Sequence, residues 1–412
     1  MRILMVSWEY PPLIYGGLGR HVHGLAEALA ADGHDVTVIS QAMPGVAGED
    51  EAGGARIIRA EANAPSDDFA AWVSALNHAQ IARAAELLND WRPDVVHAHD
   101  WLAAEAGTTL AWRFGCPLVA TIHATEAGLW NGWLTTPLSL ARHDTEAWLV
   151  HSAARTIVCS AAMKAEVSNA FGVDPAELTE VPNAVDPPAW QSTPDQRHAM
   201  RVRMSIADGD PLVVLAGRIE WEKGGDVAVR ALPHIRHRHG GTQLVLAGSG
   251  SQRSSLTELA TEHDVAGAVH FAGHLDEGEL AALLGAADVA LVPSSYEPFG
   301  MVALEASASG TPVIAGAAGG LPEVVASGET GLLVPPRDPA ALADAVVQLL
   351  EDPGYGTRLV EAAQREIAKR FVWPLVARET EKVYGEAIAE PRPPRPRPAP
   401  IAPGNVFTGE PA

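Results

Sequence analysis

The 412-residue chain is poor in cysteine and in basic residues. Its two cysteines, Cys116 and Cys159, provide neither a disulfide framework nor a plausible zinc site, which fits a reducing compartment. Only 29 Lys and Arg stand against 51 Asp and Glu, which gives a net charge of −22, and only four of the basic residues are lysines. Because a surface this negative repels phosphate backbones, we expect no nucleic-acid partner.

Long hydrophobic runs are also missing. The N-terminal run Ile3–Val6 is too short for a signal peptide, and the stretch 280–292 contains Asp288 and is too short to cross a bilayer. The composition, 47% apolar and 19% charged, is typical of a globular protein, and the length allows two or three domains. We therefore expect a cytoplasmic protein with no integral membrane segment.

Several cofactor and metal motifs are absent. The dinucleotide fingerprint fails at its third glycine in residues 17–22 and again in residues 248–250, no Gly-Lys pair exists for a P-loop, and no His-Glu-x-x-His is present. The group His97-x-His99-Asp100 resembles a metal cluster, but the sequence shows no third convergent ligand. We predict no metal and no cofactor apart from the substrates.

Short apolar runs alternate with helical patterns along most of the chain, and these runs are continuous in Val, Ile and Leu. Such strands suit parallel sheets covered on both faces, so the sequence predicts an α/β fold of the doubly wound kind. The candidate helices include 19–31, 68–89, 138–152 and 161–171. The candidate strands are 3–7, 35–40, 55–59, 94–98, 118–122 and 156–159, then 212–216, 243–247, 268–271, 289–292, 312–315 and 331–334.

A proline-rich stretch without a sustained period, residues 182–211, divides this alternating pattern into two halves of similar size. We predict two similar domains, 1–186 and 187–372, and not one TIM barrel, which offers no reason for such a break. Residues 391–412 contain eight prolines and are predicted to be a disordered tail. Its Arg-Pro repeats could bind a proline-recognising partner, although a passive tail is the better interpretation.

Two loops at predicted strand ends are candidates for binding an anion. Residues 16–19, which include Gly16 and Gly17, could present backbone N–H groups to an anion, and a plain tight turn is an equal alternative. Arg218 and Lys223 stand five residues apart before a glycine pair, an arrangement suited to a diphosphate. A solvated charged loop is the weaker alternative, because Lys223 is one of only four lysines.

Polar and aromatic residues follow other strands. Glu297 and Glu305 flank Gly300, so that both carboxylates could bind sugar or ribose hydroxyls, with a helix salt bridge as an equal alternative for Glu305. Asp100 and His123 end two predicted strands of one sheet and are expected to project to the same edge.

Two tryptophans, Trp130 and Trp133, lie in a loop just after His123. Sugar faces stack on aromatic rings, so this pair could bind an acceptor glucan. A hydrophobic plug between the loop and its domain is equally compatible with the sequence.

In combination, these motifs resemble the retaining GT-B glycosyltransferases of family 4, close to bacterial glycogen synthases and to the actinobacterial enzymes that extend methylglucose lipopolysaccharide. The resemblance covers about residues 1–384, and it rests on these stretches: 16–19, 97–101, 121–123, 182–186, 217–224 and 297–305. It implies two Rossmann-like domains that face each other across a cleft. The first would bind the acceptor, the second would bind the nucleotide-sugar donor, and a C-terminal helix at 373–387 would cross back to the first domain.

The resemblance also implies roles for individual residues and a reaction. Glucose would move from ADP- or UDP-glucose to an α-1,4-glucan without a metal, in a chain whose oligomeric state the sequence leaves open. The alternatives are a GDP-mannose-dependent mannosyltransferase acting on a lipid-linked acceptor, a non-catalytic sugar-binding protein and, more weakly, an epimerase. By resemblance, the catalytic residues are Arg218, Lys223, His123 and Glu297, the donor-binding residues are Gly16, Gly17, Phe299, Gly300, Glu305 and Gly248, and the acceptor-binding residues are Asp100, Trp130 and Trp133.

Overall fold

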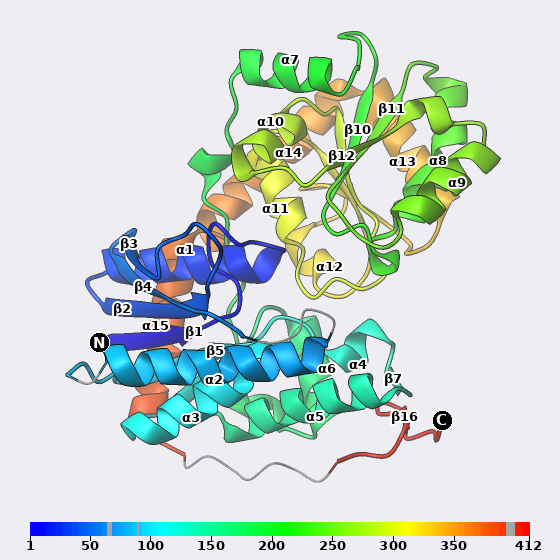
Figure 1. Ribbon diagram of the computed structural model, residues 1–412. Coiled ribbons are helices and arrows are strands. Elements are labelled where there is room, and N and C mark those ends of the chain that lie inside the picture. Colours follow the sequence, from blue (N-terminus) through cyan, green and yellow to red (C-terminus); the bar gives the residue numbers. More distant parts are fainter. Residues whose placement is uncertain (64–67, 89, 393–399) are drawn as a thin grey trace. The chain divides into compact units, whose positions relative to one another are not determined.

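The computed structural model describes residues 1–63, 68–88, 90–392 and 400–412. These residues form two compact units (Figure 1). Unit 1 comprises Met1–Pro182 and Trp373–Ala412, and unit 2 comprises Asn183–Val372. The chain passes from unit 1 to unit 2 after Pro182, four residues before the expected boundary at 186, and it returns to unit 1 after Val372, which is the expected end of the second domain.

Unit 1 is built on an eight-stranded sheet of order β3-β4-β2-β1-β5-β6-β8-β9, in which only the edge strand β3 is antiparallel. Helices α1 and α15 pack together on one face, and α2, α3 and α5 cover the other (Figure 1). The strands are β1 Arg2–Val6, β2 Asp35–Gln41, β3 Glu49–Ala52, β4 Ala55–Ala60, β5 Val95–His99, β6 Leu118–Ile122, β8 Arg155–Val158 and β9 Leu178–Glu180. The helices are α1 Gly17–Ala31, α2 Phe69–Leu87, α3 Ala104–Phe114, α4 Glu126–Leu129, α5 Pro137–Ser152, α6 Ala161–Phe171 and α15 Trp373–Ala389, with 3₁₀ turns η1 Trp101–Ala103 and η2 Pro175–Glu177.

Unit 2 is built on a six-stranded, wholly parallel sheet of order β12-β11-β10-β13-β14-β15. Helices α8, α9 and α13 cover one face, and α10, α11 and α14 cover the other. The strands are β10 Leu212–Ala216, β11 Gln243–Ala247, β12 Val269–Gly273, β13 Val289–Val292, β14 Val313–Gly316 and β15 Leu332–Val334. The helices are α7 Pro194–Arg203, α8 Gly225–Arg238, α9 Arg253–Glu262, α10 Glu277–Gly285, α11 Met301–Ala308, α12 Leu321–Val324, α13 Pro339–Glu351 and α14 Pro353–Arg370, with 3₁₀ turns η3 Pro187–Trp190, η4 Trp221–Lys223 and η5 Ala266–Ala268.

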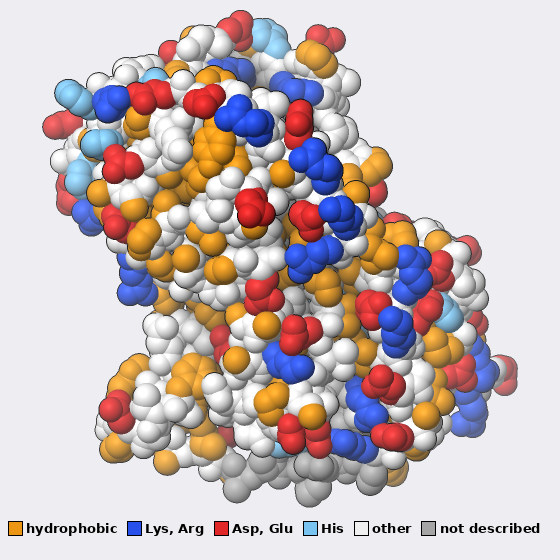
Figure 2. Space-filling model, turned by 180° about the vertical axis from the view of Figure 1, so that it is seen from behind, with side chains coloured by type: hydrophobic (Ala, Val, Ile, Leu, Met, Phe, Trp, Pro, Cys, Tyr) orange, Lys and Arg blue, Asp and Glu red, His pale blue; other side chains and the backbone are white. Residues whose placement is uncertain are grey.

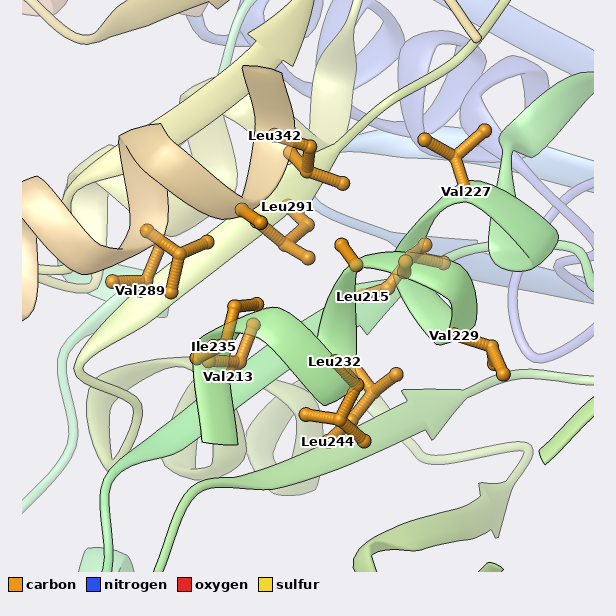
Figure 3. Close-up of a cluster of buried hydrophobic side chains, with 14 of the residues drawn as sticks. Val213, Leu215, Val227, Val229, Leu232, Ile235, Leu244, Val289, Leu291 and Leu342 are labelled. Atoms are coloured by element: carbon orange, nitrogen blue, oxygen red, sulfur yellow. The ribbon is translucent and has the colours of Figure 1, made fainter. Parts of the chain in front are cut away.

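The core of unit 2 shows how the apolar runs specify the sheet. Val213 and Leu215 are two residues apart on β10 and therefore point to the same face of the sheet, where they meet Leu232 of α8 and Leu342 of α13 (Figure 3). Each of these side chains is at least 97% buried, and burial of such a side chain stabilises the fold by about 1.5–3 kcal/mol. The continuous strands therefore lie inside two helical layers, and the prediction of doubly wound parallel sheets is confirmed.

Two segments differ from expectation. The proline-rich stretch 182–211 contains a regular helix, α7, which begins at a capping box between Thr193 and Gln196. Residues 400–412 lie in the predicted disordered tail, yet β16 (Gly404–Asn405) pairs antiparallel with β7 (Trp133–Leu134) in unit 1. The prediction of disorder was wrong for this part, because the segment satisfies its backbone groups against another loop. Residues 393–399 of the predicted tail lie outside the described residues.

Candidate functional site

Both sheets have the strand order 3-2-1-4-5-6 of a Rossmann fold when the edge strands β3 and β9 of unit 1 are set aside. In this order the second and third strands lie on one side of the first strand, and the fourth strand lies on its other side. The position between the first and fourth strands is the switch point, and these strands are β1 and β5 in unit 1 and β10 and β13 in unit 2. Ligands of such sheets bind at the carboxyl ends of these strands. The predicted site residues Asp100, Arg218 and Glu297 all follow one of them.

In unit 2, the loops after β10 and β13 are fastened to each other. Gly224 has φ +72°, and a Cβ there would lie 2.3 Å from the carbonyl oxygen of Pro293. The amide of Ser295 also donates to the carbonyl of Glu222 at 2.8 Å. The loop that carries Arg218 and Lys223 is therefore held against the loop that carries Glu297.

The cations of these loops are paired with carboxylates. Lys223 Nζ lies 2.8 Å from Glu297 Oε2, which also accepts a hydrogen bond from the Ser294 hydroxyl at 3.0 Å. Arg218 Nη2 lies 2.8 Å from Oε1 of the buried Glu222. Lys223 and Glu297, which the sequence assigned to separate parts of the donor, thus form an ion pair, and Glu222, to which it assigned no role, holds Arg218.

Gly248 and Gly217 bring two loop backbones into close approach. Both have positive φ, +142° and +130°, and a Cβ on Gly248 would lie 1.9 Å from the carbonyl oxygen of Gly217. Only glycine fits this contact. Gly248 therefore allows the loop that carries Arg218 to lie against its own loop. This close approach requires a glycine at position 248, whether or not Gly248 also binds the donor as predicted.

The remaining donor candidates of unit 2 lie around the start of α11. Gly300, with φ +114°, is the residue before the helix. The Phe299 ring is buried against Phe371 at a centroid distance of 5.9 Å, so Phe299 can offer a ligand its backbone but not its ring face. Glu305 is fully buried on α11. Its carboxylate lies inside the protein and not on the surface.

In unit 1, the glycine loop after β1 is organised by Glu9. This carboxylate is buried, and its Oε2 accepts N–H groups from Tyr15 at 2.8 Å and Gly16 at 3.2 Å. Burial raises the pKa of Glu9, while these backbone donors act in the opposite direction. A Cβ on Gly19 would lie 2.8 Å from the same oxygen. The N–H of Gly16 is therefore engaged by a protein carboxylate, and Gly17, the other glycine of this loop predicted to bind the donor, is the first residue of α1.

Asp100 and His123 lie together at the ends of β5 and β6, as expected. Asp100 Oδ1 accepts the backbone N–H of His123 at 2.6 Å, and Asp100 itself has the left-handed φ of 58°. Burial raises the pKa of Asp100 to about 7, an effect that outweighs the backbone donors of His123 and Ala124. This carboxyl group therefore titrates near neutral pH.

Two further histidines approach His123. Its Nε2 lies 3.3 Å from His99 Nδ1, and the ring of His21 on α1 lies 4.7 Å from its ring, centroid to centroid. One nitrogen from each of the three lies within 4.8 Å of the others, so they could be drawn onto one metal ion. Burial lowers the pKa of His99 and His123, which keeps both rings neutral. His21 is the third convergent group that the sequence did not reveal.

His97, the other histidine of the predicted metal-like cluster, has a different environment. Its Nδ1 lies 2.7 Å from the hydroxyl of Tyr384 on α15, and its Nε2 lies 2.7 Å from Thr121 Oγ1. Burial lowers its pKa to about 3. Both nitrogens are engaged within the protein, so His97 connects α15 to the sheet and does not act as a ligand.

Trp130 and Trp133 are both exposed, by 45% and 42%. Trp130 Nε1 donates to Glu126 Oε1 at 3.1 Å. Trp133 lies in β7 opposite Asn405 of the C-terminal segment, whose side-chain amide donates to the Asn131 carbonyl at 3.2 Å. The C-terminal segment therefore braces the tryptophan loop.

The chain matches two families along its length: the family described as Glycosyltransferase Family 4 over residues 15–188, and Glycosyl transferases group 1 over residues 196–366. It is also 45% identical to a glycogen synthase of Mycobacterium tuberculosis, over 96% of this chain and 97% of that protein. The chain belongs to the GT-B glycosyltransferases. This glycosyltransferase is 34% identical to a D-inositol 3-phosphate glycosyltransferase of Acidothermus cellulolyticus, over 95% of this chain and 91% of the relative.

The solved structures agree with the fold. A sucrose-phosphate synthase of Thermosynechococcus elongatus superposes with a TM-score of 0.79 at 27% identity, covering 94% of this chain and 99% of that one. The predicted family, fold and enzyme class are therefore confirmed. Among the described residues, no helix of this glycosyltransferase is long and apolar enough to span a membrane. On the face drawn in Figure 2, acidic and basic side chains are interspersed.

Proposed function

We propose that this glycosyltransferase moves glucose from ADP- or UDP-glucose to an α-1,4-glucan with retention of configuration. The observation that carries the proposal is the Lys223–Glu297 pair, held with Arg218 at the switch point of a Rossmann-like sheet. The 45% identity to a glycogen synthase supports glucose as the sugar and a glucan as the acceptor.

In this proposal the donor binds at unit 2. Arg218 and Lys223 donate hydrogen bonds to the diphosphate. They neutralise the charge that develops on it as its bond to C1 of glucose breaks, so no metal ion is required. Glu297 exchanges its contact with Lys223 for the hydroxyls of the donor sugar, next to the backbone of Phe299 and Gly300. Glu305 and Gly248 complete the donor-binding set; because Glu305 is fully buried, its carboxylate must become exposed before it can bind the ribose.

In unit 1, Gly17 is assigned to donor binding, His123 to catalysis and Asp100 to acceptor binding, with Trp130 and Trp133 as stacking surfaces for the glucan. The bond between C1 of glucose and the diphosphate oxygen breaks while the acceptor hydroxyl attacks C1 from the same face. The hydroxyl proton passes to the departing phosphate oxygen. His123 stays neutral because its pKa is lowered by burial, so it acts as a hydrogen-bonding group and not as a cation.

A phosphorylated small acceptor is a second candidate. The relative at 34% identity is named as a glycosyltransferase of D-inositol 3-phosphate. In unit 1, Arg142 pairs with Glu126 through Nη1, but its Nε has no hydrogen-bond partner among the described residues, and this remaining guanidinium donor suits a phosphate oxygen.

Nucleotide release tests the proposal. The enzyme is incubated with ADP-glucose, UDP-glucose and GDP-mannose in turn, first alone and then with malto-oligosaccharides, inositol phosphate or a hexose phosphate. We expect release with a glucose donor that malto-oligosaccharides accelerate. Acceleration only by a phosphorylated acceptor favours the second candidate, release only from GDP-mannose contradicts the choice of sugar, and no release with any donor favours a non-catalytic sugar-binding protein.

A further inference from the structure

Unit 1 contains a chain of aromatic side chains that the predicted site residues do not include. Trp8 and Tyr15 stack with centroids 5.2 Å apart and planes 12° apart. Trp8 also meets Trp72 edge-on at 6.2 Å, and Trp72 stacks on Phe69 at 5.6 Å. Phe69 in turn meets Trp101 edge-on at 6.0 Å. These five rings form one continuous set, which we call the aromatic belt.

The belt lies at the switch point of unit 1. Trp8 follows β1, Tyr15 stands just before α1, and Trp101 follows Asp100 at the end of β5. Phe69 and Trp72 come from the first turn of α2. The belt therefore adjoins Asp100 and the glycine loop, at the edge of the sheet where a Rossmann-like unit binds ligands.

Two rings of the belt are open to solvent. Tyr15 is 61% exposed and Phe69 is 42% exposed, and the other three rings are partly exposed. Contiguous exposed apolar surface marks an interaction site more often than an isolated exposed residue does. A surface of this kind at a ligand-binding edge points to a ligand that covers ring faces.

The guanidinium that contacts the belt is paired with a carboxylate. The Arg142 guanidinium lies 5.5 Å from the Phe69 centroid and 5.6 Å from the Trp101 centroid. Its Nη1 also lies 3.1 Å from Glu126 Oε2, so the cation is paired with a carboxylate. Arg142 therefore fixes two rings by cation–π contact without adding net charge, and the belt presents rigid, neutral ring faces.

We propose that the aromatic belt is a binding track for the units of a neutral α-glucan chain that lie beyond the reacting sugar. The apolar faces of pyranose rings cover aromatic rings, and rings already held in place lose little conformational entropy when the chain binds. This proposal rests on the proposed function, because it takes the acceptor to be a glucan, and it extends that function by adding Tyr15, Phe69 and Trp72, which would determine affinity for longer chains.

The experiment compares Tyr15→Ala and Phe69→Ala with Trp112→Ala, which removes a tryptophan that is 74% exposed on α3 of the same unit, outside the belt. The kinetics are measured with maltose and with maltohexaose. For each belt variant we expect KM for maltohexaose to rise about three- to tenfold with kcat unchanged, as loss of one stacking contact predicts. Maltose should be affected less, Tyr15→Phe should retain wild-type values, and Trp112→Ala should match wild type.

A second measurement needs no donor: electrophoretic retardation of the folded protein in native gels that contain glycogen. We expect glycogen to retard the wild type more than Tyr15→Ala or Phe69→Ala. Retardation of the wild type that the belt variants lose supports the belt even if no donor releases nucleotide, which separates this proposal from the proposed function. Unchanged retardation together with unchanged maltohexaose KM in both variants, or the same loss in Trp112→Ala, overturns it.

Discussion

Asp100→Asn should change how the stability of unit 1 depends on pH. The folded pKa of Asp100 is about 7, against 3.8 for an unperturbed aspartate, so between these values the folded chain keeps a proton that the unfolded chain has lost. Because the pKa of Asp100 is raised in the folded chain, its protonated carboxyl group stabilises the folded state. This contribution is complete below pH 3.8 and is lost as the pH rises through 7. Each pH unit in this window contributes about 1.4 kcal/mol.

When the pH rises from 5 to 8, ionisation of Asp100 therefore lowers the free energy of unfolding of the wild type by about 2–3 kcal/mol. Asn cannot titrate, and its side-chain oxygen can still accept the N–H of His123. The variant should accordingly gain about 2–3 kcal/mol relative to wild type when the pH rises from 5 to 8. The gain is measured by urea unfolding at both pH values, followed by tryptophan fluorescence, since nine of the eleven tryptophans belong to unit 1.

The control for this measurement is Asp32→Asn, which replaces an exposed carboxylate at the end of α1. Its stability relative to wild type should change by less than about 0.5 kcal/mol between the two pH values, as is usual for surface substitutions. An equal difference between Asp100→Asn and wild type at pH 5 and pH 8 would refute the reasoning, because it would mean that Asp100 is already ionised at pH 5.

Three further predictions concern the loops. Gly248→Ala should lower the free energy of unfolding by at least about 2 kcal/mol in urea titration, because its Cβ collides with the Gly217 carbonyl, whereas Gly267→Ala, which has open space, should change it by less than about 0.5 kcal/mol. Asn405→Ala should expose the C-terminal segment to carboxypeptidase, since it removes three side-chain hydrogen bonds worth about 1 kcal/mol each, and wild-type resistance in the variant would argue against the brace. Glu9→Gln weakens the acceptor of the glycine-loop N–H groups and should raise donor KM several-fold with folding intact by circular dichroism; an unchanged donor KM would show that the loop does not need this carboxylate.

The strands could be predicted because parallel strands buried on both faces are continuous apolar runs. The runs at 118–122, 212–216, 243–247 and 289–292 coincide with β6, β10, β11 and β13. The sequence did not reveal β3, whose residues Glu49–Ala52 are mostly acidic and exposed, because an edge strand is held by backbone hydrogen bonds to one neighbour and needs no apolar face. The short strand β16 was missed because it too is held by backbone hydrogen bonds to one partner, and that partner, β7, lies far away in the sequence.

The positions of Asp100, His123 and Lys223 after strand ends could be predicted from the sequence, because each follows a continuous apolar run. Contacts between distant elements could not be predicted in the same way. His21 meets His99 and His123 only because the tertiary fold brings the ring on α1 to the histidines at the ends of β5 and β6, and Glu9 holds the glycine loop only because the chain folds back after β1. Nor does a single sequence show that α2 brings Phe69 against Trp101.

The central claim is that Arg218 and Lys223 take the role that a metal ion has in other nucleotide-sugar enzymes. Its most direct test is the turnover of the glucose donor with a malto-oligosaccharide acceptor in the presence of EDTA, for wild type, Arg218→Ala, Lys223→Ala and the control Lys369→Ala, which removes an exposed lysine of α14. We predict that wild type and Lys369→Ala keep full activity, while Arg218→Ala and Lys223→Ala each lose about 10²–10³ in kcat, or about 3–4 kcal/mol. Loss of wild-type activity in EDTA, or near wild-type activity in either of the two variants, would contradict the claim.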